Sequence, residues 1–458
     1  MAAVDTLTVI EPATEAVLAE LPRPDVEETD AAVARAKRAL PAWRAMAPGD
    51  RAKLLYGLAD ALDAKREDLA VLEARNAGKP IGDARGEMQM VVDTFRYYAG
   101  APERNLGDTI PVAGGVAMTF REPLGVVALI VPWNFPLTIA AWKLAPALAA
   151  GNTVVLKPAE LTPLTAIEFE KIALDAGLPE GVVNVVAGPG RTCGQRLVEH
   201  PDVAKVAFTG STEVGRGIAA GAADTIKRVT LELGGKSANI VFADADIERA
   251  AAAALPAVFG NAGQDCCARS RILVERPAYD DFMAALEPHL AQLRVGDPLD
   301  ADTEMGPLIS AGQREAVASY LDDGAPVALQ GNAPDGPGFW FPPTVLAPVD
   351  RKARAATEEI FGPIACVITF DGEAEAVALA NDTIYGLSGS VWTRDGAKAL
   401  RTARAIETGV ISINSNTSVR VATPFGGFKQ SGVGRELGPH ALEHYSEVKS
   451  VYYATGEN

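Results

Sequence analysis

The sequence predicts an α/β protein with a parallel sheet, and two observations carry this prediction. After residue 125, short apolar runs alternate with longer runs of helical periodicity, which is the pattern of βαβ units. The chain has 458 residues, of which 48% are hydrophobic and 22% charged, so it can form a core in more than one domain. Parallel sheets bind ligands beyond the carboxyl ends of their strands, so functional residues are expected in the turns that follow strands.

The N-terminal region is predicted to be extended over residues 1–28 and helical beyond them. Thr29 and Asp30 offer an N-cap to the first helix, and Asp50 offers one to the second. The predicted helices cover residues 31–40, 51–69 and 86–98. A glycine-containing turn at 113–115 then leads into a short strand.

The rest of the chain is predicted to alternate between strands and helices in two successive regions. The first region has strands over residues 126–131, 152–156, 182–186 and 205–208, with helices over 137–149 and 163–176. The second has strands over residues 239–242, 271–274, 365–370 and 391–392 and near 345, with helices over 247–259 and 279–293 and after residue 307. A strand-like alternation over 445–453 closes the chain.

Composition narrows the class of function. The formal net charge of −17 argues against nucleic-acid binding and against a basic membrane-surface role. The four cysteines form no CxxC pair and no metal-ligand spacing, so we expect no metal, no disulfide framework and a cytoplasmic location. Residues 1–5 carry no basic leader, so no signal peptide is expected. The uncharged stretch 123–142 is interrupted by Pro132 and Pro136, which indicates a buried strand, a turn and a buried helix rather than a membrane span.

Cys266 is the candidate nucleophile. It lies in the turn 261–269 between a predicted helix and a predicted strand, and Gly263 in this turn allows the thiol to face a cleft. A free cysteine is more often a small buried apolar residue, so this position alone leaves both interpretations open.

A turn for cofactor phosphates is expected at residues 208–215. It follows a strand and opens a helix that Ser211 or Thr212 can cap, and helix N-termini attract phosphate groups. The turn of Gly190 and Gly194 upstream has a related character. An ordinary capped turn explains either segment as well.

Lys157 and Glu160 follow the end of another strand. A carboxylate at this position can accept hydrogen bonds from both hydroxyls of a ribose, and it would repel a 2′-phosphate. The alternative is a solvated Lys–Glu pair with little effect on stability.

Glu232 and Asn134 supply the remaining groups that carbonyl chemistry needs. Glu232 lies in an apolar strand, where burial would raise its pKa towards the range of a general base. A salt bridge to Lys236 or to an arginine is the alternative. Asn134 lies in a turn stiffened by two prolines, where its amide could donate to an oxyanion or could satisfy the backbone of its own turn. With Cys266, these groups fit a reaction in which a thiol attacks an aldehyde, hydride leaves to a nicotinamide, and water hydrolyses the thioester.

The motifs resemble those of the aldehyde dehydrogenase superfamily, in order and in spacing, from about Tyr97 to Ser450. They are PWNFP at 132–136, LKPAE at 156–160, FTGST at 208–212, LELGGK at 231–236, GQDC at 263–266, EIFGP at 359–363 and PFGG at 424–427. The resemblance implies two Rossmann-like α/β domains, one for the cofactor and one for catalysis, and a β-arm for oligomerisation. The implied boundaries are 1–104 and 123–233 for the dinucleotide-binding domain, 234–438 for the catalytic domain, and 105–122 and 439–458 for the arm.

The resemblance also implies the roles of individual residues. Cys266 is the nucleophile with Cys267 as its non-catalytic neighbour, and Glu232 activates the water that hydrolyses the thioester. Asn134 and the backbone N–H of Cys266 form the oxyanion hole. NAD is the implied cofactor, and NADP is less favoured because of Glu160. The implied cofactor contacts are Pro132, Trp133, Lys157, Glu160, Gly190, Gly194, Phe208, Gly210, Ser211, Gly215, Leu233, Gly234, Glu359 and Phe361.

The implied product is a free acid, because members that acylate coenzyme A lack a Glu at the position of Glu232. The implied substrate pocket consists of Phe135, Trp142, Asp265, Cys267, Val419 and Phe425. Asp265 resembles the aspartate of aminobutyraldehyde dehydrogenases and could hold a distal ammonium or change the thiol's pKa. Val419, however, stands where aminoaldehyde and betaine-aldehyde members place an aromatic residue. The expected substrate is an ω-aminoaldehyde or a broader range of aliphatic and aromatic aldehydes, and the expected assembly is a homodimer or homotetramer.

Two other functions use the same residues differently. A cofactor-independent thiol esterase would also act through Cys266, but the dinucleotide motifs argue against it. A catalytically silent descendant of the fold is disfavoured because Asn134, Glu232 and Cys266 are all intact.

Overall fold

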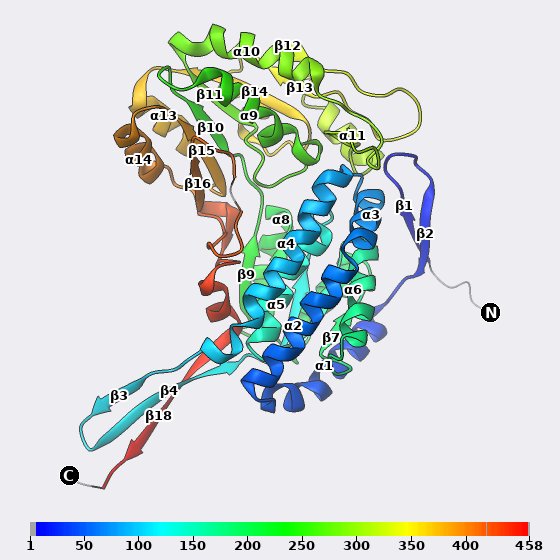
Figure 1. Ribbon diagram of the computed structural model, residues 1–458, viewed down its shortest axis with the longest axis vertical. Helices are drawn as coiled ribbons and strands as arrows, with labels where there is room; N and C mark the ends of the chain where they lie inside the picture. The colour runs from blue at the N-terminus through cyan, green and yellow to red at the C-terminus, as the bar shows by residue number, and fades with distance from the viewer. Residues whose placement is uncertain (1–5, 418, 457–458) are drawn as a thin grey trace.

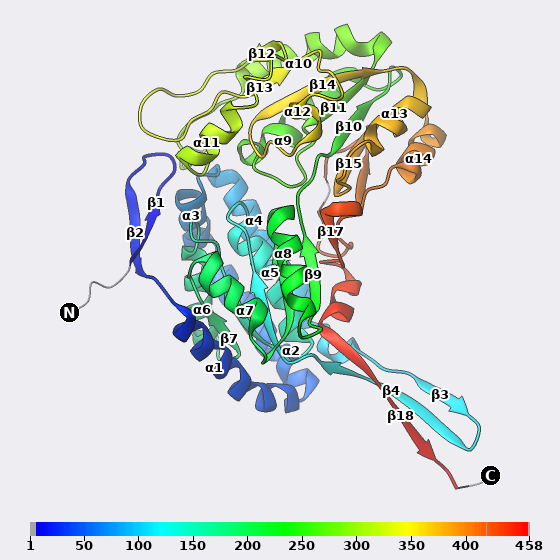
Figure 2. The same ribbon diagram turned by 180° about the vertical axis from the view of Figure 1, so that it is seen from behind.

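The computed structural model describes residues 6–417 and 419–456, so residues 1–5, over which no signal peptide is expected, lie outside the described residues. Two large sheets, each covered by helices, form the body of the protein, and a thin third sheet projects from it (Figures 1 and 2). The predicted α/β class and the alternating order of strands and helices are confirmed. In the described part of the chain, no helix combines the length and the apolar character that crossing a membrane requires.

The first large sheet has six strands in the order β17-β9-β8-β5-β6-β7. Their bounds are β5 Val126–Ile130, β6 Thr153–Lys157, β7 Val183–Val185, β8 Val203–Thr209, β9 Arg228–Glu232 and β17 Gly432–Val433. Strands β5 to β9 run parallel, whereas the late strand β17 pairs antiparallel with β9 and places Gly432 opposite Glu232. Strands β5 and β6 are buried along their whole length, as expected for a parallel sheet covered on both faces.

Eight helices of the described chain belong to this half of the molecule (Figure 1). They are α1 Val26–Ala45, α2 Pro48–Ala64, α3 Arg66–Ala77, α4 Ile81–Ala99, α5 Pro136–Ala149, α6 Leu164–Asp175, α7 Gln195–Glu199 and α8 Thr212–Ala223. The hairpin of β1 (Thr6–Ile10) and β2 (Val17–Pro22) precedes them. A tightly packed apolar core, which includes Phe95, Leu144 and Phe169, joins α4, α5 and α6 to the sheet.

The predicted bounds of the first helices were wrong, and α4 too begins at Ile81, five residues before the predicted 86. Helix α1 begins five residues before the predicted start, at Val26, because the side chain of Asp25 accepts a hydrogen bond from Glu28 N and caps it. Thr29 lies inside this helix and donates its hydroxyl to the carbonyl oxygen of Asp25. Asp50 lies in the first turn of α2 instead of capping it, and the chain breaks at Lys65 before α3 begins.

The second large sheet has seven strands in the order β12-β13-β14-β11-β10-β15-β16, and all its pairs except β12–β13 are parallel. Its strands are β10 Ala238–Val241, β11 Arg271–Glu275, β12 Val327–Gln330, β13 Thr344–Leu346, β14 Ile364–Phe370, β15 Ser388–Trp392 and β16 Val410–Ile413. Its helices are α9 Ile247–Phe259, α10 Tyr279–Gln292, α11 Ala311–Ala318, α12 Arg354–Thr357, α13 Gly372–Asn381 and α14 Gly396–Ala405. The exposed edge strand β12 and the elements α13, α14 and β16 were not predicted from the sequence.

The third sheet is an arm of three antiparallel strands in the order β18-β4-β3. Its strands are β3 Thr109–Val112, β4 Gly115–Pro123 and β18 Ser446–Ala454. The arm therefore combines an early hairpin of the chain with its last strand. Strands β4 and β18 pair along their whole length, from Ser446 opposite Pro123 to Ala454 opposite Gly115. The arm extends well clear of the body in both views (Figures 1 and 2).

Candidate active site

The turn that carries Cys266 has an unusual backbone. It follows α9, and three consecutive residues, Asn261, Ala262 and Gly263, have φ values of 50°, 55° and 69°. Residues other than glycine rarely adopt this left-handed conformation, and it costs free energy unless the surroundings impose it. At Gly263 a Cβ atom would lie 2.2 Å from the carbonyl oxygen of Gly362, so this turn packs directly on the loop before β14. The turn is therefore rigidly held where it presents Cys266.

Cys266 is half-buried and lies where two cavities meet. The larger cavity has a volume of about 440 Å³ and the smaller of about 260 Å³. Among the described residues, Thr209, Leu233 and Cys266 line both. The simple alternative, that Cys266 is only a buried apolar residue, does not explain this position.

The surroundings of the thiol favour its protonated form. The neighbouring Cys267 and burial raise the pKa of Cys266 well above its ordinary value, and the charges of Asp265 and Glu359 act in the same direction. The carboxyl group of Asp265 accepts a hydrogen bond from Cys267 N at 2.8 Å and thereby holds the turn. Asp265 therefore opposes ionisation of the Cys266 thiol. The thiol must lose its proton before it can attack a substrate.

Asn134 connects two loops across the site. It lies in the turn between β5 and α5, and its Nδ2 donates to the carbonyl oxygen of Gln264, two residues before Cys266, at 2.9 Å. The amide therefore bonds to the cysteine turn and not to its own turn. An amide nitrogen carries two hydrogens, so a second N–H can face a substrate oxygen. Asn134 lines the smaller cavity together with Cys266.

Glu232 is the last residue of β9 and is only 3% exposed. Burial raises its pKa well above the ordinary value, and the nearby charge of Glu436 raises it further. Neither carboxyl oxygen has a hydrogen-bond partner among the described residues, and Lys236 Nζ, also buried, likewise has none. The predicted alternative of a salt bridge to Lys236 is therefore not observed. Glu232 lines the larger cavity, and its carboxyl oxygens are buried.

The smaller cavity gathers most of the predicted cofactor residues. Those that line it are Pro132, Trp133, Gly210, Ser211, Leu233, Gly234, Glu359 and Phe361. The carboxyl group of Glu359 accepts a hydrogen bond from Gly235 N at 2.9 Å, and burial raises its pKa to about 7. A Cβ atom at Gly234 would lie 2.2 Å from Glu359 Oε2, so glycine lets this carboxyl group approach the backbone closely. Ser211 caps α8 by accepting from Val214 N, which places the helix N-terminus at the cavity wall.

The other predicted cofactor residues lie outside this lining. Glu160 accepts a hydrogen bond from Gly190 N at 3.1 Å, whereas Lys157 Nζ donates to the carbonyl oxygen of Pro158 at 2.6 Å. A Cβ atom at Gly194 would lie 3.4 Å from Cδ of Lys157. These contacts place four predicted residues at the carboxyl end of β6, namely Lys157, Glu160, Gly190 and Gly194. Two further glycines mark close packing behind the cavity. A Cβ atom would lie 2.5 Å from the Phe208 ring at Gly210 and 2.5 Å from the Leu233 side chain at Gly215.

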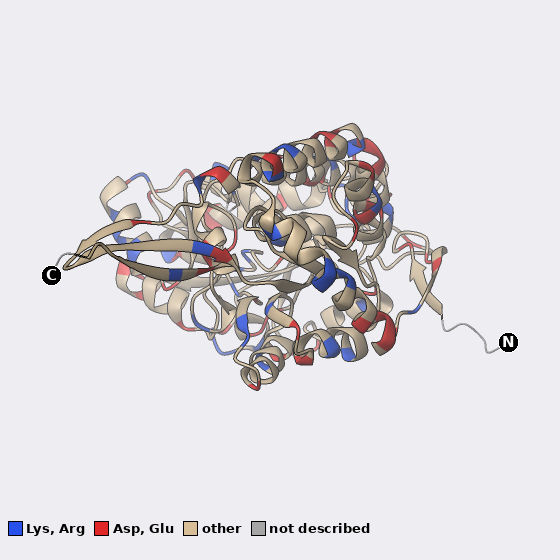
Figure 3. Cartoon of the chain, turned by 90° about the horizontal axis from the view of Figure 1, so that it is seen from below, with Lys and Arg blue, Asp and Glu red and all other residues tan. Residues whose placement is uncertain are grey.

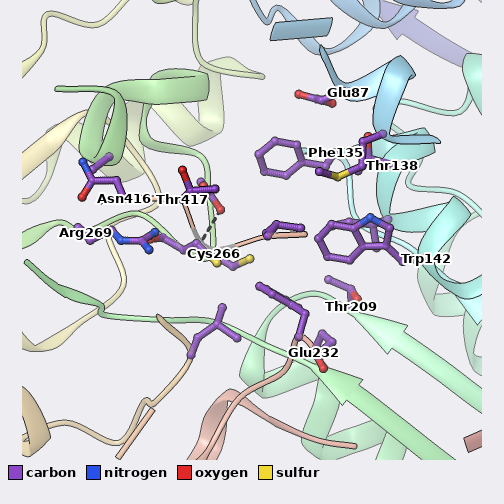
Figure 4. A pocket seen from close by; sticks show the side chains of 18 of the residues that line it. Glu87, Phe135, Thr138, Trp142, Thr209, Glu232, Cys266, Arg269, Asn416 and Thr417 are labelled. Carbon is purple, nitrogen blue, oxygen red and sulfur yellow. Dashed lines mark hydrogen bonds between the residues drawn. The ribbon is translucent and has the colours of Figure 1, made fainter. Parts of the chain in front are cut away.

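The larger cavity gathers all six predicted substrate-pocket residues. They are Phe135, Trp142, Asp265, Cys267, Val419 and Phe425. Its wall also includes residues that the sequence did not indicate, namely Glu87, Met90, Thr138, Ile139, Pro256, Ala257, Arg269, Leu387, Asn416 and Thr417. In Figure 4, Cys266 lies between the aromatic rings of Phe135 and Trp142 on one side and Arg269 and Asn416 on the other. Glu87 is the least expected member, since it comes from α4, which carries no motif.

A half-buried cysteine between a substrate-sized cavity and a second cavity at the carboxyl ends of a parallel sheet is the arrangement of an α/β enzyme with a candidate catalytic thiol. The sequence model of the aldehyde dehydrogenase family matches residues 1–451. The chain is 42% identical over 460 residues to betaine aldehyde dehydrogenase of Bacillus subtilis, covering 98% of this chain and 94% of that protein. It is 45% identical over 465 residues to phenylacetaldehyde dehydrogenase of Pseudomonas fluorescens, covering 98% of this chain and 93% of that protein. The solved betaine aldehyde dehydrogenase of Staphylococcus aureus in complex with NAD+ is similar with a TM-score of 0.97 and 38% identity, covering 100% of this chain and 93% of the other.

The chain therefore belongs to the aldehyde dehydrogenase family. This confirms the predicted family, and the match also includes the helices before Tyr97, for which the motifs gave no indication. The predicted three-part division of the chain and the roles of individual residues are taken up as proposals below.

Proposed function

We propose that this enzyme oxidises an aldehyde to the carboxylic acid with NAD, through a covalent intermediate on Cys266. The observation that carries the proposal is the position of Cys266 at the junction of two cavities, one lined by aromatic rings and one at the end of the parallel sheet. In the overall reaction, an aldehyde, NAD+ and water give a carboxylic acid, NADH and one proton. The thiol of Cys266 loses its proton and its sulfur forms a bond to the carbonyl carbon.

Asn134 is the proposed oxyanion donor. As the sulfur–carbon bond forms, negative charge develops on the former carbonyl oxygen, and donors fixed in advance stabilise it most effectively. The hydrogen bond from Asn134 to Gln264 fixes the amide against the cysteine turn, and the backbone N–H of Cys266 is the proposed second donor. The site can therefore stabilise the negatively charged substrate oxygen without having to reorganise.

The residues of the smaller cavity fit a dinucleotide. Glu359 would bind the nicotinamide ribose through its carboxyl group, Phe361 would contact the ring, and Ser211 at the α8 N-terminus would meet the pyrophosphate. Lys157 and Glu160 would hold the adenosine ribose, which favours NAD over NADP. NAD, when bound, accepts the hydride from the thiohemiacetal carbon and so leaves a thioester on the cysteine.

Glu232 is the proposed base for hydrolysis of the thioester. Its carboxyl oxygens are buried and have no hydrogen-bond partner among the described residues, so they are free to accept a proton from a water molecule that reaches them from the larger cavity. Its raised pKa means that the group must first ionise, after which it is a stronger base than an exposed glutamate. Water then attacks the thioester carbon, the carbon–sulfur bond breaks, and Cys266 is released with the acid.

The proposed substrate class is neutral aliphatic and aromatic aldehydes. Aromatic side chains dominate one wall of the larger cavity, with the rings of Trp142 and Phe425 5.2 Å apart. Of its carboxyl groups, Asp265 already accepts a hydrogen bond from Cys267 N, and Glu87 is paired with Lys79. The Arg269 side chain also lines this wall, which disfavours a cationic substrate group there.

The test is NADH formation with either NAD or NADP and a panel of aliphatic, aromatic, ω-amino and betaine aldehydes. We expect turnover with NAD, highest for neutral aldehydes, and its loss in Cys266→Ala with dinucleotide binding retained. Ester cleavage by the wild type without dinucleotide and without NADH formation on any aldehyde would instead favour the esterase alternative. Retained turnover in Cys266→Ala would exclude the proposed nucleophile.

We also propose that the chain divides into a dinucleotide-binding part (1–104 and 123–233), a catalytic part (234–438) and an arm (105–122 and 439–458) that joins copies into a homodimer or homotetramer. Residues 109–120 and 450–456 carry no charge, and Figure 3 shows the outer half of the arm without acidic or basic residues. Tyr452 and Tyr453 are 56% and 65% exposed there, and such apolar surfaces mark association sites. Light scattering should give a dimer or tetramer mass that Tyr452→Glu reduces, and a monomeric wild type would exclude the proposal.

The four free cysteines suit a reducing cytoplasm, which is the proposed location of the protein.

A further inference from the structure

Lys79 is a buried lysine that bonds to the loop carrying Asn134. It lies in the turn between α3 and α4, and its side chain has no exposed surface. Its Nζ donates to both carboxyl oxygens of Glu87, at 2.8 and 2.6 Å, and to the backbone carbonyl oxygen of Asn134 at 2.9 Å. It also lies 4.4 Å from the centroid of the Phe135 ring. One ammonium group thus joins α4 to two consecutive residues of the turn before α5.

These contacts complete a set of hydrogen bonds that fixes Asn134 at both ends. Its carbonyl oxygen accepts from Lys79 and, at 3.1 Å, from Nδ2 of Asn261. Its side-chain Nδ2 donates to the carbonyl oxygen of Gln264. The same Asn261 amide also donates to Gln264 O at 3.1 Å, so Lys79 is the contributor that comes from outside the two loops. The direction of the Asn134 amide therefore depends on a group that does not line the cavity containing Asn134.

The charges near Lys79 explain why a lysine can be buried there. Glu73 on α3 and Asp83 and Glu87 on α4 lie near it, and burial raises the pKa of Glu73 and Glu87. The pKa of Glu87 rises to about 7, with Lys79 opposing that rise. Burying the charged Lys79–Glu87 pair costs desolvation energy, so stability alone is a weak reason for its presence. The hydrogen bond from Lys79 to Asn134 suggests a role at the site instead.

We propose that Lys79 is a positioning residue that holds the backbone of Asn134 so that the side-chain amide faces the oxygen of the reacting carbonyl, and that Glu87 fixes the ammonium in place. This inference rests on the function proposed above. It adds a residue from a helical region without motifs to the machinery around Cys266. Loss of the ammonium would leave Asn261 as the donor to the same carbonyl, so the effect should be smaller than loss of the Asn134 amide itself.

The test is a double-mutant cycle between the lysine pair and Asn134. Lys79→Met combined with Glu87→Gln removes the ammonium together with the carboxylate that it pairs with, so neither partner of this pair is left buried and charged. The nearby carboxyl group of Glu73 keeps its hydrogen bonds from Leu137 N and from the Thr165 hydroxyl. We expect this pair variant to lose about 10- to 100-fold in kcat, against about 100- to 1000-fold for Asn134→Ala, with an unchanged KM for NAD. In the Asn134→Ala background, the pair variant should cost less than about threefold more, because the group that Lys79 positions is absent.

Two controls separate positioning from general damage. Glu87→Gln alone keeps the bond from Lys79 to Asn134 and should lose less in kcat than the pair variant. Lys53→Met, at a lysine whose side chain is 80% exposed, should match the wild type. Titration of Cys266 with a thiol reagent should give equal amounts of active protein in every variant.

An equal loss in the wild-type and Asn134→Ala backgrounds would overturn the inference, since it would indicate a merely structural role. An unchanged kcat in the pair variant would also overturn it. Failure of the proposed function would look different, because the wild type itself would then form no NADH with any aldehyde.

Discussion

Replacing Glu232 by glutamine tests the proposed base with the least change of shape. The carboxyl group is buried, lines the larger cavity and has no hydrogen-bond partner among the described residues, so an amide of the same size breaks no observed bond. Attack by Cys266 and hydride transfer should continue, whereas hydrolysis of the thioester should slow by about 100- to 10,000-fold. That loss corresponds to about 2.7 to 5.4 kcal/mol of transition-state stabilisation.

Stopped-flow absorbance of NADH measures both phases. The expected trace for Glu232→Gln is a burst of one NADH per active site, followed by a steady rate lower by the factor given above. The wild type is the control, and added hydroxylamine should accelerate the slow phase because it attacks the thioester without a base. A steady rate within about threefold of the wild type would refute the assignment of Glu232 as the base.

The same variant gives a stability prediction with a defined sign. The folded-state pKa of Glu232 is raised above its ordinary 4.5, so the folded protein holds this proton more tightly than the unfolded chain. The resulting stabilisation is complete below pH 4.5 and is lost as pH rises through the folded-state pKa. Glu232→Gln has no such loss, so its melting temperature should rise relative to the wild type as pH increases over this window. Parallel melting curves of the two proteins across pH would contradict the raised pKa.

Three further substitutions test separate parts of the site. Asn134→Ala should reduce kcat by about 100- to 1000-fold while NAD binding, measured by fluorescence titration, stays unchanged; weakened NAD binding of equal size would assign it to the cofactor instead. Glu160→Ser should raise kcat/KM with NADP relative to NAD by about tenfold, because the group that repels a 2′-phosphate is removed; an unchanged ratio would exclude this role. Asp265→Asn should leave the ratio of efficiencies for aminoaldehydes and neutral aldehydes within about twofold, since this carboxyl already bonds to Cys267 N, and a collapse of aminoaldehyde turnover would show that it binds an ammonium.

Much of the fold and of the site could be predicted from the sequence because the chemistry lies in the turns after strands. Asn134, Ser211 and Glu232 each follow or end a strand of one parallel sheet, and the topology of such a sheet brings those ends to one edge. The predicted strands β5 and β6 could be recognised because their apolar runs are fully buried, whereas β18 was predicted from its alternation and is mostly exposed.

Lys79 and Glu87 could not be predicted from motifs. A lysine between Gly78 and Pro80 indicates an exposed turn, and nothing local shows that α4 and the turn before α5 will bury it. Glu87 did carry a signal, because it lies at helical spacing among Ala84 and Val91 on the buried face of α4. A carboxyl group on an apolar helix face needs a partner, which only the tertiary packing supplies.

The junction of two cavities at Cys266 also affects how the substrate range of such an enzyme can change during evolution. Among the described residues, the shared wall consists of Thr209, Leu233 and Cys266, so every other lining residue belongs to one cavity alone. Mutations at Phe135 or Trp142 can therefore alter the larger cavity without changing a residue that lines the smaller one. After gene duplication, a copy can therefore change its substrate in small steps and keep its cofactor. A laboratory library that varies only those two positions can do the same.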